Sequence, residues 1–196
     1  MKEIINLAFK LCIITAVAAL ALAFTNSITI DRIEEQIETE NKLAREEVIS
    51  PSDRFEQVEQ EEIINYEKKL GFENTEIISE VFKNIVDDEV AGYTFKVLPE
   101  GYGGEMNILV GISTEGEITG LKVVGHSETP GLGAKATEES FQNQFAGMPT
   151  STSLTVIKSG TPGDNEVQAI TGSTITTQAV TDGVNAALEV FNEMNK

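Results

Sequence analysis

Hydroxyl groups and a glycine come together just before a long helical pattern near the end of the sequence. Thr171, Gly172, Ser173 and Thr174 form this segment. In Ile175–Met194, apolar residues recur every three to four positions, which predicts a helix with one buried face. Free backbone N–H groups and the helix dipole favour a bound anion at a helix N-terminus. A hydroxyl at this place therefore either caps the helix or carries a phosphate group.

The segment from Gln168 to Thr174 resembles the flavinylation motif of flavin-carrying subunits in ion-pumping respiratory complexes. That motif reads Asp, two variable residues, Ser or Thr, Gly, Ala and Thr, and its last Thr bears FMN through a phosphoester bond. Thr174 occupies the last position here, whereas Gln168 replaces the Asp and Ser173 replaces the Ala. The change at Gln168 is the more serious one, because the Asp is a candidate recognition element for the flavin transferase.

Two upstream segments support this resemblance. Residues 128–133 read Glu-Thr-Pro-Gly-Leu-Gly, a loop of the same FMN-binding domain, and residues 101–112 are similar to the entry of that domain into its sheet. The three matches occur in the expected order and span most of the chain after about residue 90. The chain thus resembles the G subunit of the Rnf-type ferredoxin:NAD oxidoreductase, with the C subunit of the sodium-pumping quinone reductase as the nearest related family.

The resemblance implies a covalent FMN on Thr174, with its phosphate held by the backbone amides of residues 171–173. Thr176 and Thr177 follow in the first helical turn, and we expect them to point away from the anion site. These roles make the segment a cofactor attachment site rather than a catalytic site, so no catalytic residue is predicted.

The loop from Glu128 to Leu132 is expected to contribute the flavin-ring contacts. In this interpretation Leu132 and Gly131 lie against the ring and Thr129 offers a hydrogen bond. A Glu128 carboxylate near the ring would disfavour an anionic reduced flavin and lower its potential, whereas an exposed loop acid is the equally open alternative. Tyr102 is expected in the core or at the rim rather than stacked on the ring.

The N-terminal segment is long and apolar enough to cross a bilayer. Residues 4–25 are apolar except for Asn6, Lys10 and small polar residues, and about 20 apolar residues suffice. A cleaved signal peptide is the alternative, because Lys2 and the small residues near Ala23 fit a signal sequence. Since the sequence retains the segment, we expect a single-pass anchor of the inner membrane.

Charged residues predict the orientation of this anchor and exclude some partners. Lys2 and Lys10 precede the apolar stretch and acidic residues follow it, which predicts a cytoplasmic N-terminus and an extracytoplasmic domain. The formal net charge of −18 argues against nucleic acid or an anionic lipid surface as a partner. Cys12 and His126 are the only cysteine and histidine, so no metal, iron–sulfur or haem site is expected and an organic cofactor must carry electrons.

Strands and helices interleave after the anchor, which predicts an α+β fold. We expect a transmembrane anchor at 1–26, an amphipathic connecting helix at 27–50 and an FMN-binding domain at 51–196. The clearest hairpin joins Ile108–Ile112 to Ile118–Val124 across a polar loop that contains Gly116. Further elements are expected at the following ranges: helices Val58–Leu70 and Ala136–Phe145, and strands Ile77–Val86, Tyr93–Val97 and Thr155–Lys158.

The resemblance implies an electron-transfer subunit with covalent FMN, in a membrane complex that couples ferredoxin:NAD electron transfer to Na⁺ or H⁺ translocation. Its expected partners are the other subunits and a flavin transferase. No Gly-x-Gly-x-x-Gly follows a strand, so the chain offers no nicotinamide site and no substrate turnover of its own. Two alternatives remain: a flavin subunit of a sodium-pumping quinone reductase, and a flavin-free, membrane-anchored binding or assembly module in which residues 171–174 only cap the helix.

Overall fold

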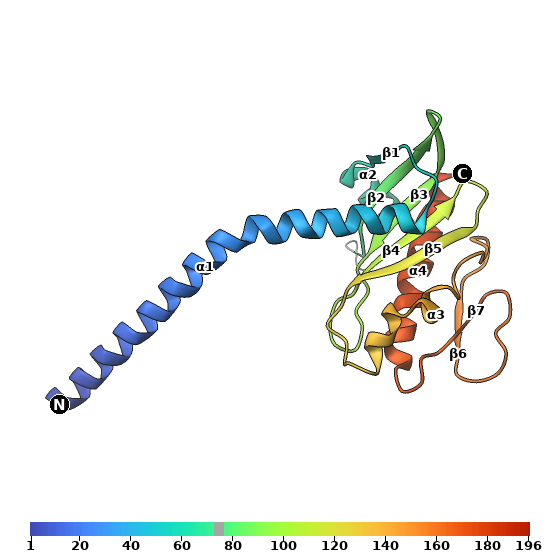
Figure 1. Ribbon diagram of the computed structural model, residues 1–196. Helices are drawn as coiled ribbons and strands as arrows, with labels where there is room; N and C mark the ends of the chain where they lie inside the picture. The colour runs from blue at the N-terminus through green and yellow to red at the C-terminus, as the bar shows by residue number, and fades with distance from the viewer. Residues whose placement is uncertain (73–76) are drawn as a thin grey trace. The chain divides into compact units, whose positions relative to one another are not determined.

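The computed structural model describes residues 1–72 and 77–196, which form two compact units, Met1–Asn41 and Lys42–Lys196 (Figure 1). Helix α1 (Lys2–Val48) runs without interruption through the first unit, and its last turns belong to the second. The apolar part of α1 has exposed side chains, and the helix is long and apolar enough to cross a membrane. The chain thus has one N-terminal helix suited to be a single-pass membrane anchor.

The second unit is built on an antiparallel sheet of five strands in sequence order (Figure 1). The strands are β1 (Arg54–Gln57), β2 (Ile78–Val86), β3 (Glu89–Val97), β4 (Asn107–Ser113) and β5 (Ile118–Gly125). Alternate residues of β3 and β4 point to one face, where Phe95 pairs with Val110 in register and both are buried. The predicted hairpin is confirmed, since Ile108 pairs with Val123 and Ile112 with Ile118.

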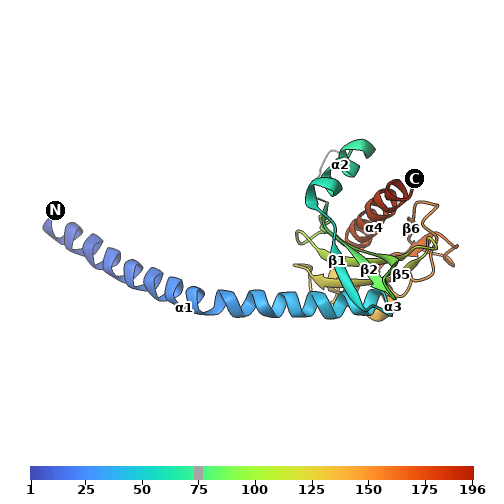
Figure 2. The same ribbon diagram turned by 90° about the horizontal axis from the view of Figure 1, so that it is seen from above.

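Two helices cover one face of this sheet (Figure 2). They are α2 (Gln60–Leu70) and the long α4 (Thr174–Met194). The apolar stripe of α4 faces the sheet, and Val180, Val184 and Phe191 join the main core with Phe95. Burial of this stripe removes apolar side chains from water and fixes the position of α4, so the start of the helix is held at a defined place beside the sheet.

Glycines on the opposite face receive the last turn of α1. A Cβ atom added to Gly111 would lie 2.3 Å from the carbonyl oxygen of Val48, and one added to Gly120 would lie 3.0 Å from the same oxygen. The hydroxyl of Thr119 donates a 2.6 Å hydrogen bond to the same Val48 carbonyl. Side chains at these glycines would displace the helix end, so the absence of side chains lets the backbone of α1 lie directly on the strands.

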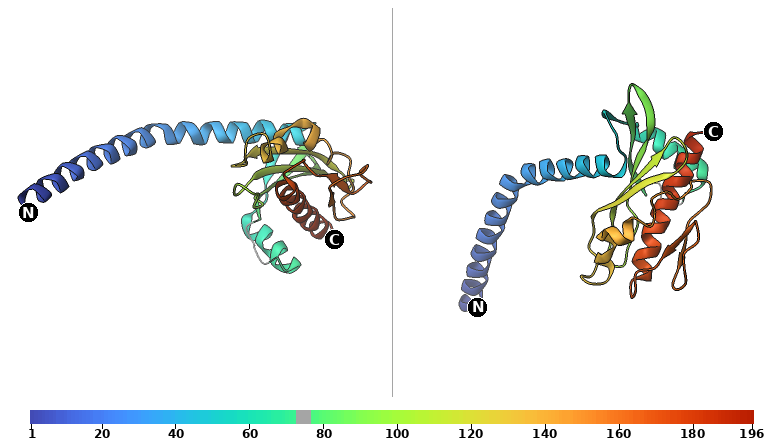
Figure 3. Two further views of the ribbon diagram at one scale, coloured as in Figure 1. Left: turned by 90° about the horizontal axis from the view of Figure 1, so that it is seen from below. Right: turned by 45° about the vertical axis from the view of Figure 1, so that its right-hand side comes forward.

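Short elements connect β5 to α4 and carry the remaining loops (Figure 3). They are a 3₁₀ turn η1 (Gly133–Thr137), helix α3 (Glu139–Gln142) and the parallel strands β6 (Thr155–Ile157) and β7 (Glu166–Gln168). The helix predicted at Ala136–Phe145 is therefore mostly wrong: a 3₁₀ turn comes first, and the α-helix covers four residues. Strand β3 begins at Glu89, four residues before the predicted Tyr93, because residues 87 and 88 form a tight turn with positive φ.

A buried carboxylate joins the ends of α2 and α4. Glu193 is paired with Lys196 and with Lys69 of α2, and its side chain is 4% exposed. The hydrogen bonds from Lys196 and then Lys69 lower the pKa of Glu193 below its ordinary value of 4.5. A lowered folded-state pKa contributes stability that is present above the ordinary value and is lost as pH falls through the folded-state value.

We therefore expect Glu193→Gln to flatten the loss of thermal stability on acidification, because the variant has no carboxylate to protonate. Thermal unfolding of the full chain in detergent, followed by circular dichroism from about pH 6 to about pH 3, measures this. Glu189→Gln on the same helix is the matched control, since Glu189 is exposed. Parallel pH profiles for the parent and Glu193→Gln would contradict the assigned role.

Candidate functional site

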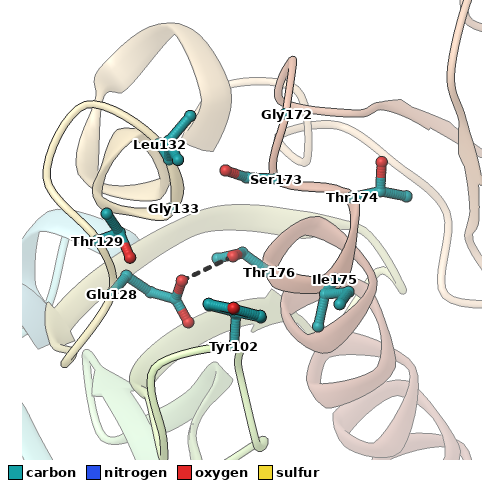
Figure 4. Close-up of a pocket in the computed structure, with 10 residues that line it drawn as sticks. All are labelled: Tyr102, Glu128, Thr129, Leu132, Gly133, Gly172, Ser173, Thr174, Ile175 and Thr176. Carbon is teal, nitrogen blue, oxygen red and sulfur yellow. Dashed lines mark hydrogen bonds between the residues drawn. The ribbon is translucent and has the colours of Figure 1, made fainter.

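The carboxylate of Glu128 connects three separate segments of the domain, and Figure 4 shows its bond to Thr176. Its Oε1 accepts a 3.0 Å hydrogen bond from the backbone N–H of Gly103, in the loop before β4. Its Oε2 accepts a 2.8 Å hydrogen bond from the hydroxyl of Thr176, in the first turn of α4. Glu128 itself follows β5 and is 6% exposed. The alternative of an exposed loop acid is therefore wrong.

Glycines make room for this carboxylate. A Cβ atom on Gly133 would lie 2.0 Å from Oε2 of Glu128, and one on Gly101 would lie 2.3 Å from Oε1. The backbone N–H of Glu128 donates to Nδ1 of His126 at 3.1 Å, so the histidine supports the loop from the strand side. A buried acidic group is costly unless hydrogen bonds satisfy it, and the bonds from Gly103 and Thr176 satisfy both carboxylate oxygens.

Hydrogen bonds to a side chain of α4, Thr177, hold the turn that precedes this helix. Ser173 N–H bonds to the Ile170 carbonyl at 2.9 Å, and Gly172 adopts φ of +81° within this turn. The Thr177 hydroxyl accepts from Ile170 N–H and donates to the Ser173 carbonyl, both at 3.0 Å. Ser173 occupies the N-cap position and its side chain makes no capping hydrogen bond, and Thr174 is the first residue of the helix.

A cavity of about 490 Å³ lies between the Glu128 loop and the start of α4 (Figure 4). Among the residues described after α1, four large apolar side chains are exposed, and three of them line this cavity: Tyr102, Leu132 and Ile175, which are 70%, 45% and 58% exposed. Small-ligand sites combine an apolar wall with a few fixed polar groups. This cavity has both, because Ser173, Thr174 and Thr129, which carry hydroxyls, also line it.

The structure brings most of the predicted site residues together. Six of them line the cavity: Glu128, Thr129, Leu132, Gly172, Ser173 and Thr174. Thr171 instead lines a second cavity of about 210 Å³, which also involves Lys135 and Gln168, and Gly131 lines neither.

Four further lining residues lie outside the predicted set: Tyr102, Gly133, Ile175 and Thr176. The expectation that Thr176 points away is wrong, because the helix turns its hydroxyl toward Glu128. Gly133 and Tyr102 lie in the two segments that resemble the FMN-binding domain, so the sequence already indicates that they lie near the site. Among the described residues, no group of three or more His, Cys, Asp or Glu is placed to hold a metal ion.

Known proteins with similar sequences place the chain in a family. The family model for the FMN-binding domain matches residues 101–189. The G subunit of the Na⁺-translocating ferredoxin:NAD⁺ oxidoreductase complex of Acetobacterium woodii is 43% identical over 197 residues, which cover 100% of this chain and 95% of that protein. The chain belongs to this G-subunit family. The G subunit of an ion-translocating oxidoreductase complex of Methanosarcina acetivorans is 34% identical, with 96% of this chain and 94% of that protein covered.

Solved structures share the fold of this G-subunit family member. The C subunit of the Na⁺-translocating NADH-quinone reductase of Parabacteroides distasonis superimposes with a TM-score of 0.55 at 20% identity, over 79% of this chain and 82% of that one. Shewanella oneidensis NqrC gives a TM-score of 0.53 at 21% identity, over 59% and 60%. The predicted fold class, a long apolar helix followed by an α+β FMN-binding domain, is confirmed.

The space at Gly133 gives a direct test of the Glu128 contacts. We expect Gly133→Ala to displace the carboxylate, break its bond to Thr176 and expose the Gly103 amide to solvent, at a cost of about 1–3 kcal/mol. Hydrogen–deuterium exchange of peptides that cover residues 101–104 measures the loss of protection. Gly163→Ala is the matched control, because a Cβ atom there meets its nearest neighbour at 3.5 Å. Unchanged protection in Gly133→Ala would show that Gly133 is not needed for these contacts.

Proposed function

We propose that this chain carries FMN on Thr174 through a phosphoester bond and acts as an electron-transfer subunit. The observation that carries the proposal is the position of Thr174. It is the first residue of α4, it is half-buried, and it lines the cavity whose wall exposes three large apolar side chains. An acceptor hydroxyl, an anion-favouring helix terminus and an apolar surface for a ring thus occur together.

The residues around Thr174 fit a phosphate followed by a planar ring. The Ser173 N–H is already bonded to the Ile170 carbonyl, so the phosphate would be held by other backbone N–H groups at the helix start and not by the whole predicted set of residues 171–173. Leu132 and Tyr102 offer apolar faces to the ring, and Thr129 offers a hydrogen bond at the cavity wall. When bound, FMN supplies a relay for one or two electrons.

Glu128 serves this site differently from a free carboxylate aimed at the ring. Both of its oxygens accept hydrogen bonds from the protein, so its main contribution is to hold the ring-binding loop against α4. Gly131 shapes the same loop with φ of +77°. Thr171 is exposed in the turn and lines the second cavity, so it contributes to the phosphate site through its backbone.

The family of the chain supports a role in a larger complex. The Acetobacterium woodii relative is a subunit of a Na⁺-translocating ferredoxin:NAD⁺ oxidoreductase, and a Clostridium ljungdahlii relative that matches 52% of this chain is a subunit of a proton-translocating one. We therefore assign this chain to a complex that couples ferredoxin:NAD electron transfer to Na⁺ or H⁺ translocation. Its partners are the other subunits and the flavin transferase that attaches the cofactor.

We base the proposed membrane arrangement on α1 and its charges. Lys2 and Lys10 favour a cytoplasmic N-terminus, with residues 1–26 as the anchor, 27–50 as the connecting helix and 51–196 as an extracytoplasmic domain. A covalent bond to Thr174 suits this side of the membrane, because a dissociable cofactor would be lost to the surroundings.

Thr174→Ala tests the attachment site. We expect complete loss of covalent flavin with a folded domain, because loss of one hydroxyl at a helix start costs only about 1 kcal/mol. The measurement is flavin fluorescence of the denatured band on a gel after co-expression with a flavin transferase. Thr171→Ala is the control and should keep most of the fluorescence. Equal fluorescence in Thr174→Ala and the parent would reject Thr174, and a non-fluorescent parent would favour a flavin-free module.

Protease treatment of intact spheroplasts tests the orientation. We expect the region after residue 26 to be digested from outside, because the lysines before the apolar stretch remain in the cytoplasm. A tag placed before Met1 should stay protected until the membrane is permeabilised, which controls for leaky spheroplasts. Full protection of the domain in intact spheroplasts would contradict the proposed orientation.

A further inference from the structure

The Thr177 hydroxyl makes contacts that helix packing alone does not require. Thr177 is fully buried, and its hydroxyl bonds at once to a residue outside the helix, Ile170, and to the N-cap residue, Ser173. Thr181, one turn later and equally buried, donates only to the Thr177 carbonyl at 2.9 Å. The ordinary way to satisfy a buried threonine in a helix is the bond that Thr181 makes. Thr177 adds an accepted bond from a backbone N–H seven positions earlier in the chain.

These bonds close the turn that presents Thr174. The turn runs from Ile170 to Ser173 and is closed by its own 2.9 Å backbone hydrogen bond. The Ser173 carbonyl accepts from both the N–H and the hydroxyl of Thr177. Both ends of the turn are therefore bonded to one side chain, and Thr174 is the next residue after it.

The strand that precedes the turn is anchored separately. The Gln144 side chain accepts from Gln168 N–H at 2.8 Å and donates to the Gln168 carbonyl at 3.4 Å, as a neighbouring strand would. Because these bonds hold Gln168, the part of the chain before Thr174 that still has to be held in place is the Ile170–Ser173 turn. Besides the backbone bonds of the turn itself, the hydroxyl of Thr177 is the side-chain contact that holds this part.

We propose that Thr177 is a positioning residue for covalent flavin attachment: its hydroxyl holds the Ile170–Ser173 turn so that the Thr174 hydroxyl is presented in one orientation. The inference rests on the proposed function of Thr174. In the attachment step, with a flavin dinucleotide as donor, Oγ1 of Thr174 forms a bond to the phosphorus on the riboflavin side. The P–O bond of the diphosphate breaks, a nucleoside monophosphate leaves, and the hydroxyl proton passes to the transferase. Such a displacement depends on the placement of the attacking oxygen.

Three variants of the full chain in detergent test this role. Thr177→Val keeps the side-chain shape and removes both hydroxyl bonds, Thr177→Ser keeps the hydroxyl, and Thr181→Val removes an equally buried hydroxyl that does not touch the turn. The measurement is the initial rate of covalent flavin incorporation with purified transferase and flavin dinucleotide. We expect Thr177→Val to be slower by about ten- to a hundredfold, and the other two to stay within about twofold of the parent.

Two further measurements separate positioning from stability. Hydrogen–deuterium exchange at the Ile170 amide should rise in Thr177→Val and not in Thr181→Val, while thermal midpoints of the two valine variants stay close. If Thr177→Val does not fold, Thr177→Cys supplies a small side chain with only weak hydrogen bonding. A Thr177→Val rate within about twofold of the parent, or an equal loss of rate in both valine variants, would overturn the proposal. A parent that accepts no flavin would instead overturn the attachment at Thr174 on which the proposal rests.

Discussion

One buried carboxylate holds the candidate site together. Glu128 receives hydrogen bonds from Gly103 and Thr176, and these two residues belong to segments that lie more than seventy positions apart in the chain. An acidic side chain that is 6% exposed is tolerated only when its oxygens are satisfied, so the folded domain requires both contacts at the same time. The loop before β4, the loop after β5 and the start of α4 consequently share one fixed geometry, and the cavity between them exists because of it.

This fixed frame explains why apolar side chains remain exposed at the cavity. Tyr102 follows the glycine at which the carboxylate fits, Leu132 precedes another, and Ile175 precedes the threonine that donates to Glu128. Each side chain is thus attached to backbone that lies directly beside a Glu128 contact. Exposed apolar surface in a fixed arrangement is costly in water and is typical of a binding surface. A planar ring would meet a wall already in place, which limits the entropy lost on binding.

The long elements and those with strongly alternating apolar residues can be predicted from the sequence. Contacts that depend on tertiary packing cannot. The periodicity of Ile175–Met194 and the alternation around Ile108–Ile112 predicted α4 and the β4–β5 hairpin, because one buried face leaves a regular pattern. Strand β1 is a polar edge strand and β7 has three residues, so neither leaves such a pattern. The side of α4 on which Thr176 lies depends on how the helix packs, and local spacing gave the wrong side.

The positions of the two cavities indicate where the replacement of the motif Asp by Gln168 would act. Gln168, which replaces the motif Asp, lines the second cavity together with Thr171 and Lys135, whereas Thr174 lines the first. The backbone of Gln168 is held by Gln144 through bonds that any residue at position 168 can make. A change of side chain there leaves the turn and the first cavity intact. In the function proposed above, the change at Gln168 therefore acts on the transferase that approaches the second cavity, and not on the surroundings of the flavin ring.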